Sequence, residues 1–260
     1  MRTTREFARI VTLAIVCISV NANLQAGSDI GELLDRLGQS VETLWTSLGS
    51  IACTETVNQA KLDGDGDVIH AKTTTFDYVI FLKLHGMDLS VEESRVVQES
   101  KQKKKDRALL VTSGFPTLPL VFHPHYQDCF EFALLGEDLI GGRRTVKVRF
   151  KHISGTRSTS ALRLRGQDYP LDLEGVAWVE PDGSRILRIH AGLARPLDNL
   201  GLHSFVCDVS YHPVKLASMA EARWLPQEAT IEAKTVRQHW RNVHRFTDYK
   251  RFSVKAETGE

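Results

Sequence analysis

The segment that decides the fold runs from Val176 to Leu193 and reads VAWVEPDGSRILRIHAGL. Its two arms, Val176 to Glu180 and Arg185 to Leu193, are rich in the aliphatic residues that favour strands. Between them stands Pro181-Asp182-Gly183-Ser184, a set of residue types that tight turns select. The segment therefore predicts an antiparallel hairpin.

The alternation of apolar and polar residues continues on both sides of this hairpin. Further strands are predicted at Thr54 to Leu62, Ile69 to Leu84, Leu89 to Glu99, Cys129 to Leu135, Thr145 to Ile153, Ser204 to Leu216, Glu228 to Val236 and His244 to Val254. The run from Leu89 to Glu99 also contains residue types that suit a helix, and we prefer the strand. The pattern predicts about eight or nine strands, mostly linked as hairpins, in an α+β protein that is mainly antiparallel β-structure.

One helix and one irregular segment interrupt this pattern. From Ser28 to Leu48 apolar residues recur three and four positions apart, which predicts an amphipathic helix. From Arg107 to Tyr126 an apolar stretch is broken by prolines, and long irregular segments of this kind often act as lids or binding loops. A meander buries its apolar face only if it curls or pairs with a second layer. We therefore expect a strongly curved open half-barrel that wraps the helix and the apolar segment.

The first residues have the pattern of an export signal. Arg2, Arg5 and Arg9 precede an apolar run from Ile10 to Val20, and small residues follow up to Ala26. We expect a signal peptide at residues 1–26, cleaved before one domain at residues 27–260, and a periplasmic location after secretion across the inner membrane. The residue before Cys17 is Val16 rather than a small residue, so no lipid anchor is expected at this cysteine.

Composition and charge exclude some classes of partner. The chain has 260 residues, and its 33 Lys and Arg nearly balance 32 Asp and Glu, so no global field attracts nucleic acid. Two basic stretches, Lys101 to Arg107 and Arg237 to Arg251, are interpreted as solvated surface. Any membrane contact is expected to be peripheral at most.

Three cysteines remain in the mature chain, Cys53, Cys129 and Cys207. In a compartment that permits disulfides, an odd number predicts one bridge and one free thiol. The sequence does not choose among the three possible pairs.

No pattern in the sequence supports catalysis, a metal or another cofactor. His123 and His125 flank Pro124 with Asp128 and Glu131 nearby, but this spacing does not define a metal site. The chain also has no Gly-x-Ser-x-Gly turn and no phosphate-binding loop. We expect no enzyme activity, and an envelope hydrolase that uses His123 or His125 ranks third among the hypotheses.

Two stretches resemble a known family. They are GVAWVEPDGSRILRI, from Gly175 to Ile189, and Trp224-Leu225-Pro226 before the strand from Glu228. Together with the order of helix and strands they resemble the periplasmic lipoprotein-carrier fold of LolA, LolB and RseB and proteins similar to outer-membrane lipoprotein-sorting proteins. The resemblance implies a half-open sheet around helices, with an apolar concave cavity that accepts acyl chains or a lipoprotein. No binding residue of that family is carried over.

The candidate binding residues follow from the apolar strand faces. The cavity wall is predicted from Phe76, Tyr78, Ile80, Leu82, Val146, Val148 and Phe150, and the lid from Phe115, Leu118, Leu120, Val121 and Phe122. Alternation alone also predicts ordinary core packing for each of the wall residues. The main hypothesis is a carrier for a lipid or a lipidated protein. The alternative is a sensor or interaction module that fills its own cavity and contacts an envelope protein.

Overall fold

The computed structural model describes residues 29–45, 50–85, 88–98, 112, 114–164, 167–217, 219 and 221–251. The predicted signal peptide, Cys17 and the basic stretch 101–107 lie outside these residues. After a helix at 29–45 come β1 (Ser50–Leu62), β2 (Val68–His85), β3 (Asp88–Val97), η1 (Phe115–Phe122), α2 (Pro124–Gln127), β4 (Phe130–Ile140), β5 (Arg143–His152), β6 (Ala161–Leu164), β7 (Gln167–Pro170), β8 (Leu173–Val179), β9 (Ile186–Leu193), η2 (Asp198–Leu200), β10 (Leu202–Val214), β11 (Arg223–Thr235) and β12 (His239–Arg251).

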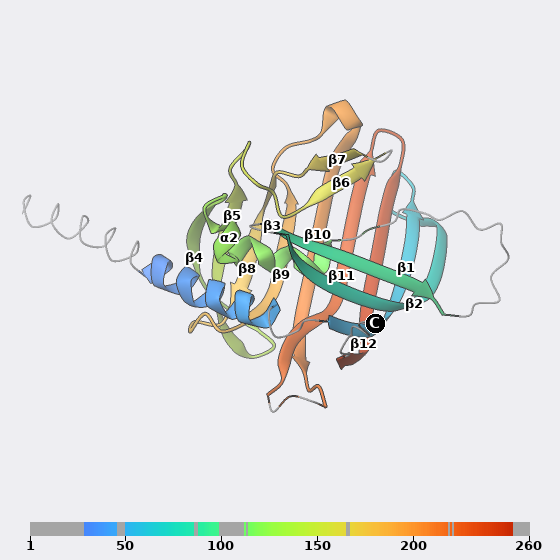
Figure 1. Cartoon of the computed structure of the whole chain (residues 1–260). Helices are drawn as coiled ribbons and strands as arrows, with labels where there is room; N and C mark the ends of the chain where they lie inside the picture. The colour runs from blue at the N-terminus through green and yellow to red at the C-terminus, as the bar shows by residue number, and fades with distance from the viewer. Residues whose placement is uncertain are drawn as a thin grey trace, which may run out of the picture.

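Ten strands form one antiparallel sheet in the order β3-β2-β1-β12-β11-β10-β9-β8-β5-β4. Most neighbours are consecutive hairpin partners, whereas the β1–β12 pair joins the first strand to the last. The sheet keeps two edges, β3 and β4, so it is open and curled rather than closed (Figure 1). The predicted half-barrel is confirmed.

The strand count and some boundaries differ from the prediction. The main sheet has ten strands rather than eight or nine, and β6 and β7 form a separate two-stranded sheet in the long β5–β8 connection. Neither ALRL nor QDYP shows strict alternation of apolar and polar residues, so the sequence pattern did not predict these two strands. β11 begins at Arg223 rather than Glu228, so Trp224-Leu225-Pro226 belongs to the strand. The ambiguous run after Leu89 is a strand, β3.

The N-terminal helix contributes one apolar stripe to the core. Leu33, Leu37, Val41 and Trp45 recur every four residues and are at most 9% exposed. The helix lies against the β8–β9 turn, where Ser40 Oγ donates to the Ser184 carbonyl oxygen at 2.6 Å (Figure 1). The predicted amphipathic helix is confirmed for residues 29–45.

Gly38 permits a close approach between the helix and the segment after η1. A Cβ atom at this position would lie 2.7 Å from Gln127 Nε2 and 3.1 Å from the Phe122 carbonyl oxygen. The same amide of Gln127 donates to the carbonyl oxygens of Leu34 and Phe122. A side chain at position 38 would therefore separate the two elements.

The proline-broken apolar segment is helical where it is described. Gly114, with a φ of 81°, precedes the 3₁₀-helix η1, in which Pro119 is tolerated because the helix is short and tight. His123 then caps α2, its Nδ1 accepting from the backbone N–H of His125 at 3.1 Å. The expectation of an irregular segment was wrong for Phe115–Tyr126. Pro116 and Pro124 stand in the first turns of η1 and α2, where proline fits a helix start, and only Pro119 lies inside a helix.

The described cysteines do not form the predicted disulfide. Cys53, Cys129 and Cys207 are all free and buried. Cys53 on β1 and Cys207 on β10 are separated along the sheet by β12 and β11, about 14 Å at the usual strand spacing. A disulfide needs Cα atoms within roughly 7 Å.

Candidate functional site

An apolar cavity lies between the concave face of the sheet, the end of the N-terminal helix and η1. Its lining comes from both ends of the chain: Leu44, Trp45, Ile51, Cys53, Tyr78, Ile80, Pro119, Tyr211, Trp224, Leu225, Pro226, Phe246 and Tyr249. None of these side chains carries a formal charge, and six are aromatic. The cavity has a volume of about 40 Å³, within about 620 Å³ of space between the lining atoms that is partly open to solvent. Such a surface suits an apolar ligand.

A β-bulge places Tyr249 in this lining. Thr54 pairs with Thr247 but Ala52 pairs with Lys250, so β12 has one residue more than β1 at this point. Asp248 and Tyr249 together lie opposite Cys53, and Asp248 has a φ of 52°, a left-handed conformation. A bulge shifts the alternation of faces by one. Tyr249 therefore points to the same face as Phe246, three residues earlier.

A second bulge lies in β11, the strand next to β12. Ser210 pairs with Glu228 and Tyr211 with Pro226, which leaves Gln227 as the extra residue. Tyr249 Oη donates to the Pro226 carbonyl oxygen at 2.6 Å, so the two bulged regions are joined by a hydrogen bond. This bond fixes one end of the cavity wall.

A buried charged network lies next to the cavity on the same sheet face. Glu55 on β1 is fully buried and receives two hydrogen bonds from Arg95 on β3, at 2.5 and 3.1 Å. Arg95 Nη1 also lies 3.0 Å from Glu93 Oε2, and its guanidinium stacks over the ring of Tyr78, which lines the cavity. The network thus contacts the cavity wall through Tyr78.

The network extends to His244 and to Thr112, before η1. His244 Nδ1 lies 2.7 Å from Glu55 Oε1, and Nε2 lies 2.8 Å from Thr112 Oγ1, which also accepts from Asn242 Nδ2 at 3.1 Å. The backbone N–H of Gly114 donates to Glu93 Oε1 at 2.6 Å. These bonds attach the chain that leads into η1 to the sheet.

The pKa shifts in this network assign its protonation states. Burial is the largest influence on Glu55 and raises its pKa, but hydrogen bonds from His244 and Arg95 together lower the pKa below its ordinary value. Burial lowers the pKa of His244, so its ring is neutral near pH 7 and donates through Nδ1 to the ionised Glu55. Burial raises the pKa of Glu93, against the opposing charge of Arg95.

Thr112, His244 and Glu55 are joined by hydrogen bonds of 2.8 and 2.7 Å, which are short enough for a catalytic triad of hydroxyl nucleophile, base and carboxylate. In the described structure, however, none of the three lines the cavity, and Thr112 is itself 8% exposed. A ligand in the cavity would not touch Thr112. The thiol of Cys53 does line the cavity, but burial raises its pKa to about 12, which keeps it neutral and weakly nucleophilic. We assign the network a positioning role.

No protein-family model matches this sequence, and no curated protein does either. The structure is similar to a DUF1329 family protein from Desulfovibrio piger (10% identity, TM-score 0.47, covering 89% of this chain and 95% of that chain). It is also similar to a domain described as an outer membrane lipoprotein-sorting protein from Vibrio parahaemolyticus (11% identity, TM-score 0.47, 88% and 95%). A LolA superfamily protein from Nitrosomonas europaea is a further match (10% identity, TM-score 0.40, 84% and 93%). The structural matches include the fold family named from the sequence.

The structure brings only part of the predicted cavity wall together. Tyr78 and Ile80 line the cavity. Val148 and Phe150 are fully buried on β5, beneath η1, and Val146 and Phe76 are half-buried outside the cavity lining. Leu82 lies in β2, but its side chain is not among the described ones.

The predicted lid residues lie deep in the core. Leu118, Leu120, Val121 and Phe122 are 0 to 3% exposed, and the Phe122 ring packs edge-on against Phe150 at 6.0 Å. The side chain of Phe115 is not described. In this conformation η1 packs against β9, β10 and β11, with Phe122 against Phe150 of β5, and among the described side chains of η1 only Pro119 lines the cavity.

The histidines of the third hypothesis have structural partners. His123 caps α2, and the His125 ring packs edge-on against Tyr126. Across the residues that the structure describes, no three His, Cys, Asp or Glu side chains are arranged to hold a metal. No helix in that part of the chain has the length and apolar composition needed to cross a bilayer.

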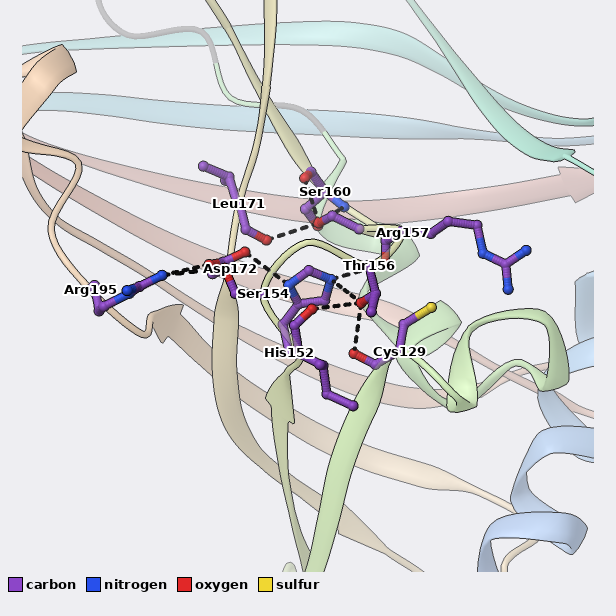
Figure 2. A network of polar contacts seen from close by, with 11 residues as sticks. Cys129, His152, Ser154, Thr156, Arg157, Ser160, Leu171, Asp172 and Arg195 are labelled. Carbon is purple, nitrogen blue, oxygen red and sulfur yellow. Dashed lines mark hydrogen bonds and ion pairs between the residues drawn. The ribbon is translucent and has the colours of Figure 1, made fainter.

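A second polar network braces the end of β5 (Figure 2). His152 Nδ1 lies 2.9 Å from Asp172 Oδ1, and Nε2 lies 3.2 Å from Thr156 Oγ1. Asp172 also accepts from Arg195, and the Thr156 hydroxyl donates to the Ile153 carbonyl oxygen at 2.6 Å. Because this hydroxyl is already used within its own turn, the network holds the loop after β5 rather than a substrate.

The outer face of the sheet carries paired charges. Arg241 and Arg245 on β12 bond Glu232 and Glu228 on β11. Two of the five Lys and Arg residues in the stretch Arg237 to Arg251 are therefore paired with acidic residues of the neighbouring strand.

Proposed function

We propose that this protein is an exported binding protein of the bacterial envelope, which holds an acyl chain of a lipid or a lipidated protein in the cavity. The observation that carries the proposal is the uncharged, aromatic lining between an open sheet and a helix. Burying one methylene contributes about 0.8 kcal/mol. Six buried methylenes would contribute about 5 kcal/mol before the costs of association.

Binding requires the cavity to widen. Its volume of about 40 Å³ is far below the roughly 300 Å³ of a typical ligand pocket. The sheet wall is fixed by continuous strand pairing, whereas Trp45 and Pro119 stand on elements that are not strands of the sheet. We therefore place the opening motion in the end of the N-terminal helix and in η1.

The same narrowness favours a second function, that of a sensor or interaction module that does not transport. In this alternative η1 and Phe122 fill the concave face permanently, and the protein acts by contacting an envelope protein. The two functions differ in whether the cavity accepts a ligand.

Ligand uptake by the mature chain distinguishes the two. Native mass spectrometry of protein purified from an envelope fraction is expected to show a co-purifying lipid or lipopeptide, and the delipidated protein is expected to bind the fluorescent probe N-phenyl-1-naphthylamine. Cys53→Leu adds volume inside the cavity and is expected to weaken probe binding at least fivefold. Val57→Leu is the matched control, since Val57 is buried on the same strand but does not line the cavity.

An empty protein that takes up no probe would refute the carrier and support the sensor. Equal loss of probe binding in Cys53→Leu and Val57→Leu, with both variants folded, would place the binding site elsewhere.

A further inference from the structure

Two buried hydrogen-bond donors that line the cavity have no acceptor. Trp45 Nε1 and the hydroxyl of Tyr211 find no hydrogen-bond partner among the described residues, and the two residues are only 9% and 8% exposed. A buried donor without an acceptor destabilises a folded protein, so native structures keep few of them. Because both donors line the same cavity, a ligand bound in this cavity would supply the acceptor that they lack.

The other polar side chains of the same lining differ from these two. Tyr249 Oη donates to the Pro226 carbonyl oxygen at 2.6 Å. The Tyr78 hydroxyl also has no hydrogen-bond partner among the described residues, but Tyr78 belongs with the charged network, because its ring lies under Arg95 and the carboxylate of Glu93 raises its pKa further after burial. The unpaired donors that lie away from the charged network are therefore Trp45 and Tyr211.

These two donors stand on different walls. Trp45 ends the described part of the N-terminal helix, and Tyr211 lies on β10 in the sheet. A ligand that enters between helix and sheet has both walls beside it. An indole N–H only donates, whereas a carbonyl oxygen has two lone pairs and can accept from both walls at once.

We propose, on the basis of the proposed function, that the cavity selects an acyl chain through its carbonyl group, which accepts hydrogen bonds from Trp45 Nε1 and the Tyr211 hydroxyl. The carbonyl is that of a neutral ester or amide. An ionised fatty acid would bring its charge into a described lining without a cationic side chain, which is costly in an apolar site. Esters occur in glycerolipids and amides in N-acylated proteins, so the preferred carbonyl also names the source of the chain.

The test compares ligands of one chain length by displacement of N-phenyl-1-naphthylamine from the mature protein. Methyl decanoate and N-methyldecanamide carry the carbonyl, methyl decyl ether lacks it, and decanoate carries a charge. We expect the better of the two carbonyl ligands to bind at least about fivefold more tightly than the ether, the effect of one to two hydrogen bonds. Whichever of ester and amide binds more tightly identifies the source.

Variants assign the effect to the two donors. Tyr211→Phe and Trp45→Phe are each expected to reduce the carbonyl-to-ether ratio about threefold or more, because only the carbonyl ligands accept from the two donors. Tyr249→Phe is the matched control in the same cavity, because its hydroxyl is already bonded to Pro226. Trp178→Phe is the control for loss of an indole, since Trp178 Nε1 donates to Asp138 Oδ2 at 3.0 Å outside the cavity.

The outcomes separate this inference from the proposed function. Equal binding of ester, amide and ether by the wild-type protein would overturn the inference and leave the carrier intact. If no ligand displaces the probe, the carrier itself fails. A ratio reduced as strongly by Tyr249→Phe as by Tyr211→Phe, or tighter binding of decanoate than of both neutral carbonyl ligands, would also overturn the inference. If Trp45→Phe does not fold, the wild-type ratio and Tyr211→Phe still decide.

Discussion

Replacement of Arg95 by methionine removes the only cation that contacts Glu55 and Glu93 among the described residues. The Arg95 side chain is 16% exposed and supplies two hydrogen bonds to Glu55 and an ion pair to Glu93. Methionine keeps much of the apolar stem that packs on Tyr78. Glu55 would retain His244 as its partner, and Glu93 the backbone N–H of Gly114. Removal of one partner of a buried pair costs about 3–5 kcal/mol, so we expect Arg95→Met to lower the free energy of unfolding by that amount.

The assay is urea unfolding of the mature protein at pH 7, followed by tryptophan fluorescence, with the slope m compared between variants. Glu55→Gln and the double variant complete a double-mutant cycle, in which we expect a coupling of about 1–3 kcal/mol between Arg95 and Glu55. A loss below about 1 kcal/mol for Arg95→Met, or no coupling in the cycle, would refute the buried network. The pair would then behave like a surface ion pair.

Three further predictions follow from buried polar groups and close packing. Tyr211→Phe removes a hydroxyl without a partner and is expected to leave the unfolding free energy unchanged or raise it by up to about 1 kcal/mol. Tyr249→Phe removes a hydrogen bond and should lower the unfolding free energy by about 1–2 kcal/mol. Equal losses for the two variants in calorimetry would contradict the difference in hydrogen bonding between the two hydroxyls. Burial holds the folded pKa of His244 below its ordinary value of 6.5, so the stability it contributes is complete above that pH and is lost as the pH falls. The urea midpoint should therefore drop less between about pH 7.5 and 5.5 in His244→Gln than in the wild type, and parallel curves would argue against it. Gly175→Ala would place a Cβ 2.1 Å from the His190 carbonyl oxygen and should unfold or strongly destabilise the protein, while Gly31→Ala, with open space around it, should be neutral or stabilising by up to about 1 kcal/mol; similar melting temperatures would contradict this packing.

Alternation made most of the sheet predictable. Strands such as β5 and β9 bury one face, and their apolar residues fall at every second position, which the sequence displays directly. The helix stripe at Leu33, Leu37 and Val41 was visible for the same reason, with a period of 3.6. The turn Pro181 to Ser184 fixed the central hairpin.

The cavity was only partly predictable. Tyr78 and Ile80 follow simple alternation, but Tyr249 faces inward only because of the bulge at Asp248, where no glycine marks the left-handed backbone. Tyr211 and Phe246 do alternate with polar neighbours, yet nothing in the sequence shows that β10 and β12 border the same space as β2. Trp224-Leu225-Pro226 resembles a family motif, but this resemblance did not indicate that the three residues line the cavity.

The buried network was not predictable. Glu55 and His244 are 189 positions apart in the chain and meet only because β1 pairs with β12. The strand run from Leu89 contains Glu93 and Arg95 on one face, and charged residues on an inward face contradict the rule used to assign faces. Charged residues on a strand predict a solvent-exposed face, whereas in this fold they are buried and paired with one another.

The proposed function requires an acyl chain to enter the cavity between the N-terminal helix, η1 and the sheet. Paramagnetic broadening of methyl resonances by 16-doxylstearic acid methyl ester, added to the mature protein, tests this entry directly. We expect broadening at Ile51, Ile80 and Leu225, and none at the fully buried Val148 and Ile189, which do not line the cavity. Broadening confined to the exposed side chains of Leu134 and Leu139, or no broadening at all, would contradict it.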